Sequence, residues 1–265
     1  MLIRLLPALI ASLALAAAAA AHGVSSPSAG PPLLPDLDQE APSRLMINMA
    51  GTASKPVYQL GFRSAVRNVG DGALVISGSR PDGSVDTMVA DQAIVRRGSP
   101  QQLVRGVGRL RYVVSPDHRH WHMLGFEHYE LRRPDGRVLV RDRKTGFCLG
   151  DRYEVTDRAL PAKAPKKRYT SRCGLGAPGL RGISEGISVG YGDSYSPVLE
   201  GQVLRLTGLP DGRYLLVHRV NVDRRIRESS YTNNAASTLL DLRWNDGVPR
   251  VTILATCADS ARCHP

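Results

Sequence analysis

Short runs of β-branched, aromatic and aliphatic residues, separated by Asp-Gly turns, constrain the fold of this chain more than any other feature. Asp-Gly is a strong signal for a tight turn between two strands, and it occurs five times in the sequence. Hardly any stretch shows the 3.6-residue periodicity of an amphipathic helix. These patterns predict an all-β protein with a β-sandwich core. We expect strands at residues 44–49, 57–69, 73–77, 87–95, 110–114, 121–131, 137–141, 202–207, 214–222, 236–244 and 251–256.

The chain divides into a leader, a linker and one domain by composition. Residues 1–21 combine a charged Arg4, an apolar stretch and a run of alanines, which is typical of a Sec-type signal peptide. Residues 22–42 are rich in Pro and Ser and predict a linker. We expect residues 43–265 to form a single domain with an immunoglobulin-like sandwich core, long functional loops and little helix. Residues 151–190 show weak patterning and predict a long loop, with room for a short helix.

Targeting and charge narrow the classes of partner. No later stretch reaches the ~18 consecutive apolar residues that span a bilayer, so we expect an exported protein, secreted, at the cell surface or periplasmic, with no stable membrane insertion. The formal net charge is +11, but the arginines are scattered along the whole chain and no nucleic-acid motif is present. We therefore expect no nucleic-acid partner and a monomer.

Four cysteines are present, at positions 148, 173, 257 and 263. An even number in an exported chain predicts two disulfides. The sequence alone allows three pairings. The short spacing at the C-terminus favours Cys257–Cys263, which would leave Cys148 to pair with Cys173.

The pattern His-x-His-x-His at His118, His120 and His122 is the strongest chemical signal in the sequence. Alternate residues of a strand project to the same face, so the three imidazoles would lie side by side at intervals of ~6.5 to 7 Å. Three adjacent histidines without a ligand are costly, because they are either unsatisfied polar groups or repelling charges. The pattern thus predicts a metal site. Imidazole suits zinc, copper, nickel and iron, and copper stands highest in the affinity order.

Four blocks of sequence follow one another along the chain: His118–His122 with Phe126–Leu131, Lys144–Asp151, Gly192–Tyr195 with Gly201–Thr207, and Asn221 with Glu228–Asn234. In this order they resemble the catalytic domain of the lysyl oxidase family, and together they cover roughly residues 110–244. The sequence departs from the family pattern in lacking several cysteines, in having Gly150 where the family has an acidic residue, and in being one residue shorter after the third histidine.

The resemblance implies a copper- and quinone-dependent amine oxidase. His118, His120 and His122 correspond to the family's Cu(II) ligands. Lys144 and Tyr195 correspond to the two residues that form its lysine tyrosylquinone cofactor, with Tyr191 as the competing tyrosine. The implied reaction is protein-lysine 6-oxidase-like: primary amines or peptidyl lysine are oxidised by O2 to aldehydes, with release of NH3 and H2O2.

The sequence leaves alternatives for the environment of Lys144, for the general base and for the residues that attract the substrate. A neutral Lys144 amine requires a desolvated pocket or nearby cations such as Arg141 and Arg143. The general base could be Asp193 or His128. An acidic mouth that attracts amine cations could come from Glu127, Glu130, Asp142 and Asp151.

An alternative from a different class is a non-catalytic, exported copper-binding β-sandwich protein. Such a protein would keep the three histidines and never build the quinone. The presence of both Lys144 and Tyr195 favours the enzyme.

Overall fold

The computed structural model describes residues 30–116, 118–142, 144, 146–157, 160, 166–199 and 201–264. Within these residues the regular structure consists of strands, turns and bends, and no helix is present. The all-β prediction is therefore confirmed for the described part of the chain. No segment of this part forms a helix long and apolar enough to cross a membrane. The predicted signal peptide, residues 1–21, lies outside the described residues.

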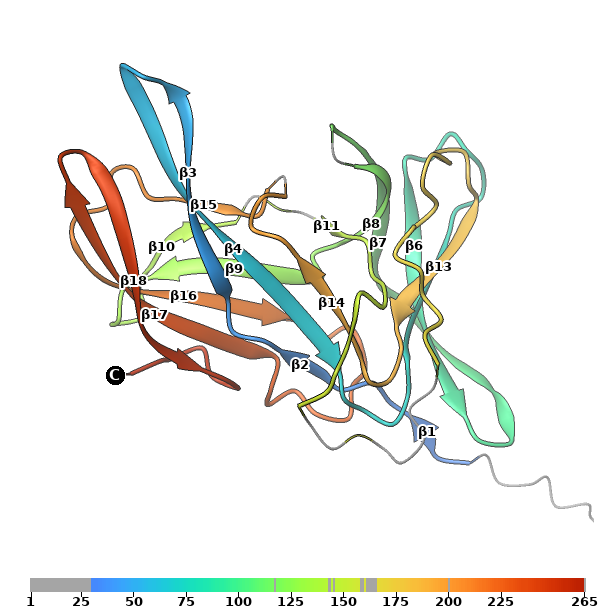
Figure 1. Ribbon diagram of the computed structural model, residues 1–265. Helices are drawn as coiled ribbons and strands as arrows, with labels where there is room; N and C mark the ends of the chain where they lie inside the picture. The colour runs from blue at the N-terminus through green and yellow to red at the C-terminus, as the bar shows by residue number, and fades with distance from the viewer. Residues whose placement is uncertain are drawn as a thin grey trace, which may run out of the picture.

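Three antiparallel sheets make up the fold (Figure 1). The first sheet has seven strands, in the order β11 (Gly146–Phe147), β8 (Arg119–Leu124), β7 (Ser99–Val114), β6 (Thr87–Arg96), β5 (Leu74–Ser79) and β13 (Gly182–Ile187), with β1 (Pro32–Leu33) also paired to β6. The second sheet has five strands, in the order β10 (Val138–Arg141), β9 (Glu127–Arg132), β16 (Gly212–Val220), β17 (Ala235–Asn245) and β18 (Val248–Cys257).

The third sheet is built around β4 (Lys55–Asn68), the strand that runs diagonally through the middle of Figure 1. This strand is long enough to pair with several short partners along its length. Strand β4 pairs with β2 (Leu37–Gln39), β3 (Ser43–Thr52), β14 (Tyr191–Tyr195) and β15 (Val203–Arg205). The remaining strand of this sheet, β12 (Tyr153–Glu154), pairs with β14.

One hydrophobic cluster is shared by all three sheets. Trp121 comes from the first sheet, Tyr129 from the second and Phe62 from the third, and each of these side chains is fully buried. The rings of Phe62 and Tyr129 lie edge to face, with centroids 5.0 Å apart. Side chains from strands far apart in sequence thus hold the sheets against one another.

The predicted strand at residues 121–131 is two strands. Gly125 has a φ of +68°, a left-handed conformation that glycine adopts without strain, and it turns the chain between β8 and β9. The two strands then enter different sheets. His128, in β9, is therefore not part of the face that carries the other histidines.

Two segments predicted to lack regular structure contribute strands. Residues 30–42, expected as linker, provide β1 and β2, and Leu37 in β2 is fully buried. Residues 151–190, expected as a loop, provide β12 and β13, and β13 pairs along its whole length with β5. Glycine, serine and glutamate in β13 hide its alternation, because Glu185 occupies a buried position that a strand pattern assigns to an apolar residue.

Candidate functional site

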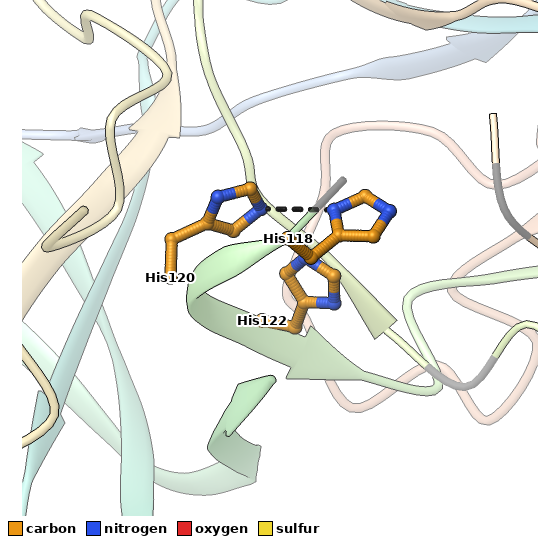
Figure 2. Close-up of side chains that lie close together, drawn as sticks. All are labelled: His118, His120 and His122. Carbon is orange, nitrogen blue, oxygen red and sulfur yellow. Dashed lines mark hydrogen bonds between the residues drawn. The ribbon is translucent and has the colours of Figure 1, made fainter. Parts of the chain in front are cut away.

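Strand β8 and the residue before it gather three imidazoles on one face of the first sheet (Figure 2). The centroids of the His118, His120 and His122 rings lie 4.7 to 5.2 Å apart. The Nδ1 atom of His118 is 3.4 Å from the Nε2 atom of His120. One ring nitrogen from each residue lies within 4.8 Å of the other two, which is close enough for one metal ion to bind all three.

Burial keeps two of these imidazoles neutral, the form that binds metals. Burial, followed by the charges of the neighbouring histidines, lowers the pKa of His120 to about 4 and that of His122 to about 2. The Nε2 atom of His122 is buried and has no hydrogen-bond partner in the described part of the chain. An orphaned imidazole nitrogen beside two others is costly, so the residues present fit a copper or zinc ion.

Lys144 and Tyr195 come together in the core. Lys144 lies between β10 and β11, and its Nζ atom is 4.4 Å from the centroid of the Tyr195 ring and 5.2 Å from that of Phe147. Only 8% of Lys144 and 3% of Tyr195 is exposed. The desolvated environment expected for Lys144 is present, and the guanidinium of Arg141 is paired with Glu130. Arg143 lies outside the described residues.

The Tyr195 hydroxyl is held at two points. It lies 2.8 Å from the backbone oxygen of Cys148 and 2.9 Å from Oδ2 of Asp193. The guanidinium of Arg152 stacks on the Tyr195 ring, 4.9 Å from its centroid, and its Nε donates to Oδ1 of Asp193. The ring, its hydroxyl and its acidic neighbour are therefore fixed by separate contacts.

Asp193 is a buried carboxyl with a perturbed proton affinity. Burial raises the pKa of Asp193 to about 7, although the adjacent Arg152 acts in the opposite direction. Burial also raises the pKa of Tyr195 well above its usual value, and the charge of Asp193 adds to this effect. A carboxyl that titrates near neutral pH can both accept and return a proton, as a general base must.

The histidine cluster and the Lys144–Tyr195 pair are neighbours. The charge of Lys144 contributes to the lowered pKa of His120 and of His122. The link is also structural, because β11 begins two residues after Lys144 and pairs with β8, the strand of the histidines. The two groups thus form one site at the edge of the first sheet.

Both predicted disulfides are present. Cys148–Cys173 ties the segment after Lys144 to the segment before β13, and Cys257–Cys263 closes a short loop at the C-terminus. Glu185 lies close to the sulfurs of the first bridge. Because those sulfurs are bonded to each other, they are not available as thiolate ligands for a metal.

Several residues considered from the sequence lie elsewhere. The hydroxyl of Tyr191 donates to Glu154 at an exposed position, so Tyr195 is the tyrosine beside Lys144. His128 pairs with Asp142.

The four acids considered for an acidic mouth do not form one. Glu130 is bound to Arg132 and Arg141, and Asp151 accepts hydrogen bonds from backbone N–H groups. Glu127, Glu130 and Asp151 are buried, and only 9% of the Asp142 side chain is exposed. Carboxylates that are buried and paired do not present a negative surface to a cation.

Sequence reasoning missed Arg152. Its neighbours show no periodicity, and its contact with the Tyr195 ring depends on β12 and β14 lying side by side. No sequence signal in this chain indicates that contact.

Comparison with known proteins identifies similarity over the part of the chain that carries the three histidines, Lys144 and Tyr195. The model of the lysyl oxidase family matches residues 107–252, which is more than half of the 265 residues. Lysyl oxidase homolog 2 of Gallus gallus is 30% identical over 128 residues, which is 48% of this chain and 15% of that protein. Lysyl oxidase homolog 3 of Homo sapiens is 30% identical over 129 residues, again 48% and 15%. Lysyl oxidase homolog 3B of Danio rerio is 31% identical over 129 residues, 48% of this chain and 14% of that protein. The matched region thus spans about a seventh of each relative's length.

Proposed function

This chain belongs to the lysyl oxidase family, and from that premise we propose that it is a copper-dependent amine oxidase. Its substrates would be primary amines or peptidyl lysine. In the overall reaction, the amine, O2 and one water give an aldehyde, ammonia and hydrogen peroxide. We further propose that the protein works as a monomer outside the cytosol, and that residues 1–21 act as the signal peptide that directs its export.

The 4.4 Å distance between Lys144 Nζ and the Tyr195 ring is the observation that carries this proposal. Formation of a lysine tyrosylquinone requires a lysine amine beside the ring of a tyrosine. A buried lysine and a buried tyrosine in contact are rare in a core unless they serve a purpose, because a buried ammonium loses its hydration. A protein that only binds copper has no need for such a pair.

Copper bound by His118, His120 and His122 would supply the one-electron chemistry through which O2 oxidises the Tyr195 ring. A quinone linking Lys144 and Tyr195 would supply the carbonyl group that condenses with the amine substrate.

Asp193 is the residue we assign as general base. Its Oδ2 atom lies 2.9 Å from the Tyr195 hydroxyl, so it can take a proton from that oxygen and return it. Arg152 holds the carboxyl in place and neutralises its charge. His128 is the weaker candidate, because its Nδ1 atom lies 3.9 Å from Oδ1 of Asp142, its side chain is half exposed, and it belongs to β9 of the second sheet.

Reconstitution is the experiment that tests this function. The full chain is incubated with Cu(II) in air, and its visible spectrum and intact mass are recorded before and after treatment with phenylhydrazine. We expect a quinone band, reaction with phenylhydrazine, and a mass that gains one oxygen atom and loses four hydrogen atoms. Lys144→Ala and Tyr195→Phe should abolish all three signals, and Tyr191→Phe should keep them. Copper bound with no quinone in the wild-type chain would instead support the non-catalytic copper-binding protein.

A further inference from the structure

A glutamate and a histidine form a hydrogen-bonded pair in the core of the second sheet. The Nε2 atom of His218 in β16 lies 2.7 Å from Oε2 of Glu127 in β9, and neither side chain is exposed to solvent. Burial of a carboxylate costs several kcal/mol unless its surroundings compensate. Neither residue belongs to the site as described so far, so the pair requires its own explanation.

The hydrogen bonds around His218 determine which atoms carry its protons. The Nε2 amide of Gln39 donates to the backbone oxygen of Ala65 and, at 2.7 Å, to Nδ1 of His218. Because Nδ1 accepts, the imidazole hydrogen is on Nε2 and is donated to Glu127. The imidazole is therefore neutral, and Glu127 is a negative charge that its histidine does not cancel.

Tyr129 extends this network towards Tyr195. Its hydroxyl donates to the same Oε2 atom of Glu127, at 3.1 Å, and also lies 3.1 Å from Oγ of Ser64. Burial, together with the charge of Glu127, raises the pKa of Tyr129 well above its usual value, so this hydroxyl keeps its proton and acts as a donor. Two donors on one oxygen stabilise the ionised carboxylate.

The network borders the candidate site on two sides. Ser64 in β4 lies directly opposite Tyr195 in the antiparallel pair with β14. The Phe147 ring packs against both tyrosines, with its centroid 6.1 Å from that of Tyr129 and 5.2 Å from that of Tyr195. The negative charge of Glu127 is accordingly among the causes that raise the pKa of Tyr195 and of Asp193.

Four groups from four segments act on Asp193. Arg152 lies just before β12 and stabilises the ionised carboxylate. Tyr195 of β14 shares a hydrogen bond with it, and Glu185 of β13 and Glu127 of β9 are the other two acids within electrostatic range. Burial raises the pKa of Glu185 well above its usual value, which favours its uncharged form. Glu127, whose carboxylate accepts hydrogen bonds from His218 and Tyr129, is the negative charge that opposes Arg152.

We propose that Glu127 is a positioning residue for Asp193: a fixed negative charge, held by His218 and Tyr129, that opposes the charge of Arg152 at the Asp193–Tyr195 pair. The inference rests on the proposed function, because it gives Asp193 a role in turnover. Glu127 makes Asp193 a better base for the amine reaction. The same charge makes the Tyr195 hydroxyl harder to ionise, which slows its conversion to a quinone.

Glu127→Gln should have different effects on the maturation of Tyr195 and on turnover of the amine: the rate of maturation should rise, and Asp193 should become a weaker base. A glutamine side chain has nearly the same shape as glutamate, and its carbonyl oxygen can still accept hydrogen bonds from His218 and Tyr129, but it carries no charge. Tyr195 should mature severalfold faster after copper is added, because its hydroxyl ionises more readily. The acid limb of the pH profile of kcat/KM should move to lower pH by roughly one unit. A purely structural defect would slow maturation and leave the position of the limb unchanged.

A titration of the full chain before copper is added tests the charge directly. The carboxyl stretch of protonated Asp193 is followed by infrared spectroscopy and assigned by its loss in Asp193→Asn. Glu127→Gln should lower the midpoint by roughly one pH unit, about tenfold in proton affinity. The matched control is Glu130→Gln, because Glu130 lies on the same strand with its side chain on the opposite face, bound to Arg132 and Arg141. Its midpoint should equal that of the wild type.

A second variant covers the case in which Glu127→Gln does not fold. The double substitution Glu127→Met with His218→Leu replaces the pair by apolar side chains of similar volume, a change that buried ion pairs often tolerate. It should lower the Asp193 midpoint in the same way. An unchanged midpoint in either folded variant would overturn the proposal, and so would failure of both variants to fold, since the pair would then be structural.

The titration separates this inference from the proposed function. If no quinone forms in the wild-type chain but the midpoint falls in Glu127→Gln, the charge acts on Asp193 and the assigned enzyme activity is wrong. If the quinone forms and the midpoint stays in place, the activity stands and the role of Glu127 is wrong.

Discussion

Gly146 shows how a single residue controls the geometry of the histidine cluster. A Cβ atom at this position would lie 2.7 Å from Cβ of His122 and 3.3 Å from the backbone oxygen of Met123. Real Cβ atoms do not come that close to another carbon, and a backbone atom cannot move aside cheaply. Only glycine lets β11 lie against β8 while His122 keeps its place among the imidazoles.

Gly146→Ala should therefore weaken metal binding while the protein remains folded. Displacement of His122 or β11 is expected to lower the affinity for Cu(II) by roughly 10- to 100-fold, the range seen when the support of a metal ligand is disturbed. Competition with a chelator measures this affinity. Gly83→Ala is the matched control, because a Cβ atom there meets nothing within 4 Å. Equal affinities in the two variants would show that Gly146 does not position His122.

Among the elements, the segment from Lys144 to Cys148 depends on a covalent anchor. It contains β11, a strand of only two residues, and the Cys148–Cys173 bridge fixes its far end. The backbone oxygen of Cys148 also accepts the hydrogen bond from Tyr195. The disulfide thus holds two parts of the candidate site together: the segment that carries Lys144, and the hydroxyl of the tyrosine.

Replacing Cys148 and Cys173 by alanine should lower both stability and quinone yield. The bridge spans 25 residues, and loop-closure entropy gives a loss of about 3.5 kcal/mol in the free energy of unfolding. The control pair is Cys257 and Cys263, which are separated by 6 residues. Its removal should cost about 2 kcal/mol and leave the quinone yield unchanged. Urea unfolding and the visible spectrum provide the two readouts. Equal quinone yields from both variants would argue against an anchoring role for the first bridge.

Glu228 connects distant parts of the whole molecule. Its carboxylate accepts hydrogen bonds from the backbone N–H of Leu37 and from the amides of Asn221 and Asn234. These contacts join β2, near the start of the described chain, to the two ends of the β16–β17 connection. Burial raises the pKa of Glu228 to about 7, although the three hydrogen bonds act in the opposite direction.

The stability that Glu228 contributes should fall as the pH rises. Its folded pKa of about 7 lies above the unfolded value of ~4.3, so the folded state holds the proton more tightly. The resulting stabilisation is full below the unfolded pKa and is lost as the pH rises through 7. In metal-free protein, the stability advantage of the wild type over Glu228→Gln should shrink by roughly 2.5 kcal/mol between pH 5 and pH 8. Urea unfolding at the two pH values measures it, and an advantage that grows with pH would contradict the assignment.

The sequence by itself determined the all-β class, most of the longer strands and the histidine face, because alternation, Asp-Gly turns and spacing are local properties. It also identified Lys144 and Tyr195, through short blocks that resemble a family. Only the tertiary structure decided that these two residues meet, that Tyr195 and not Tyr191 lies beside the lysine, and that Arg152 stacks on its ring. Strands β13 and β14 were not predicted from the sequence either. Their glycine, serine and acidic residues become strand only by pairing with β5 and β4, and such long-range pairing leaves no periodic signal in the chain.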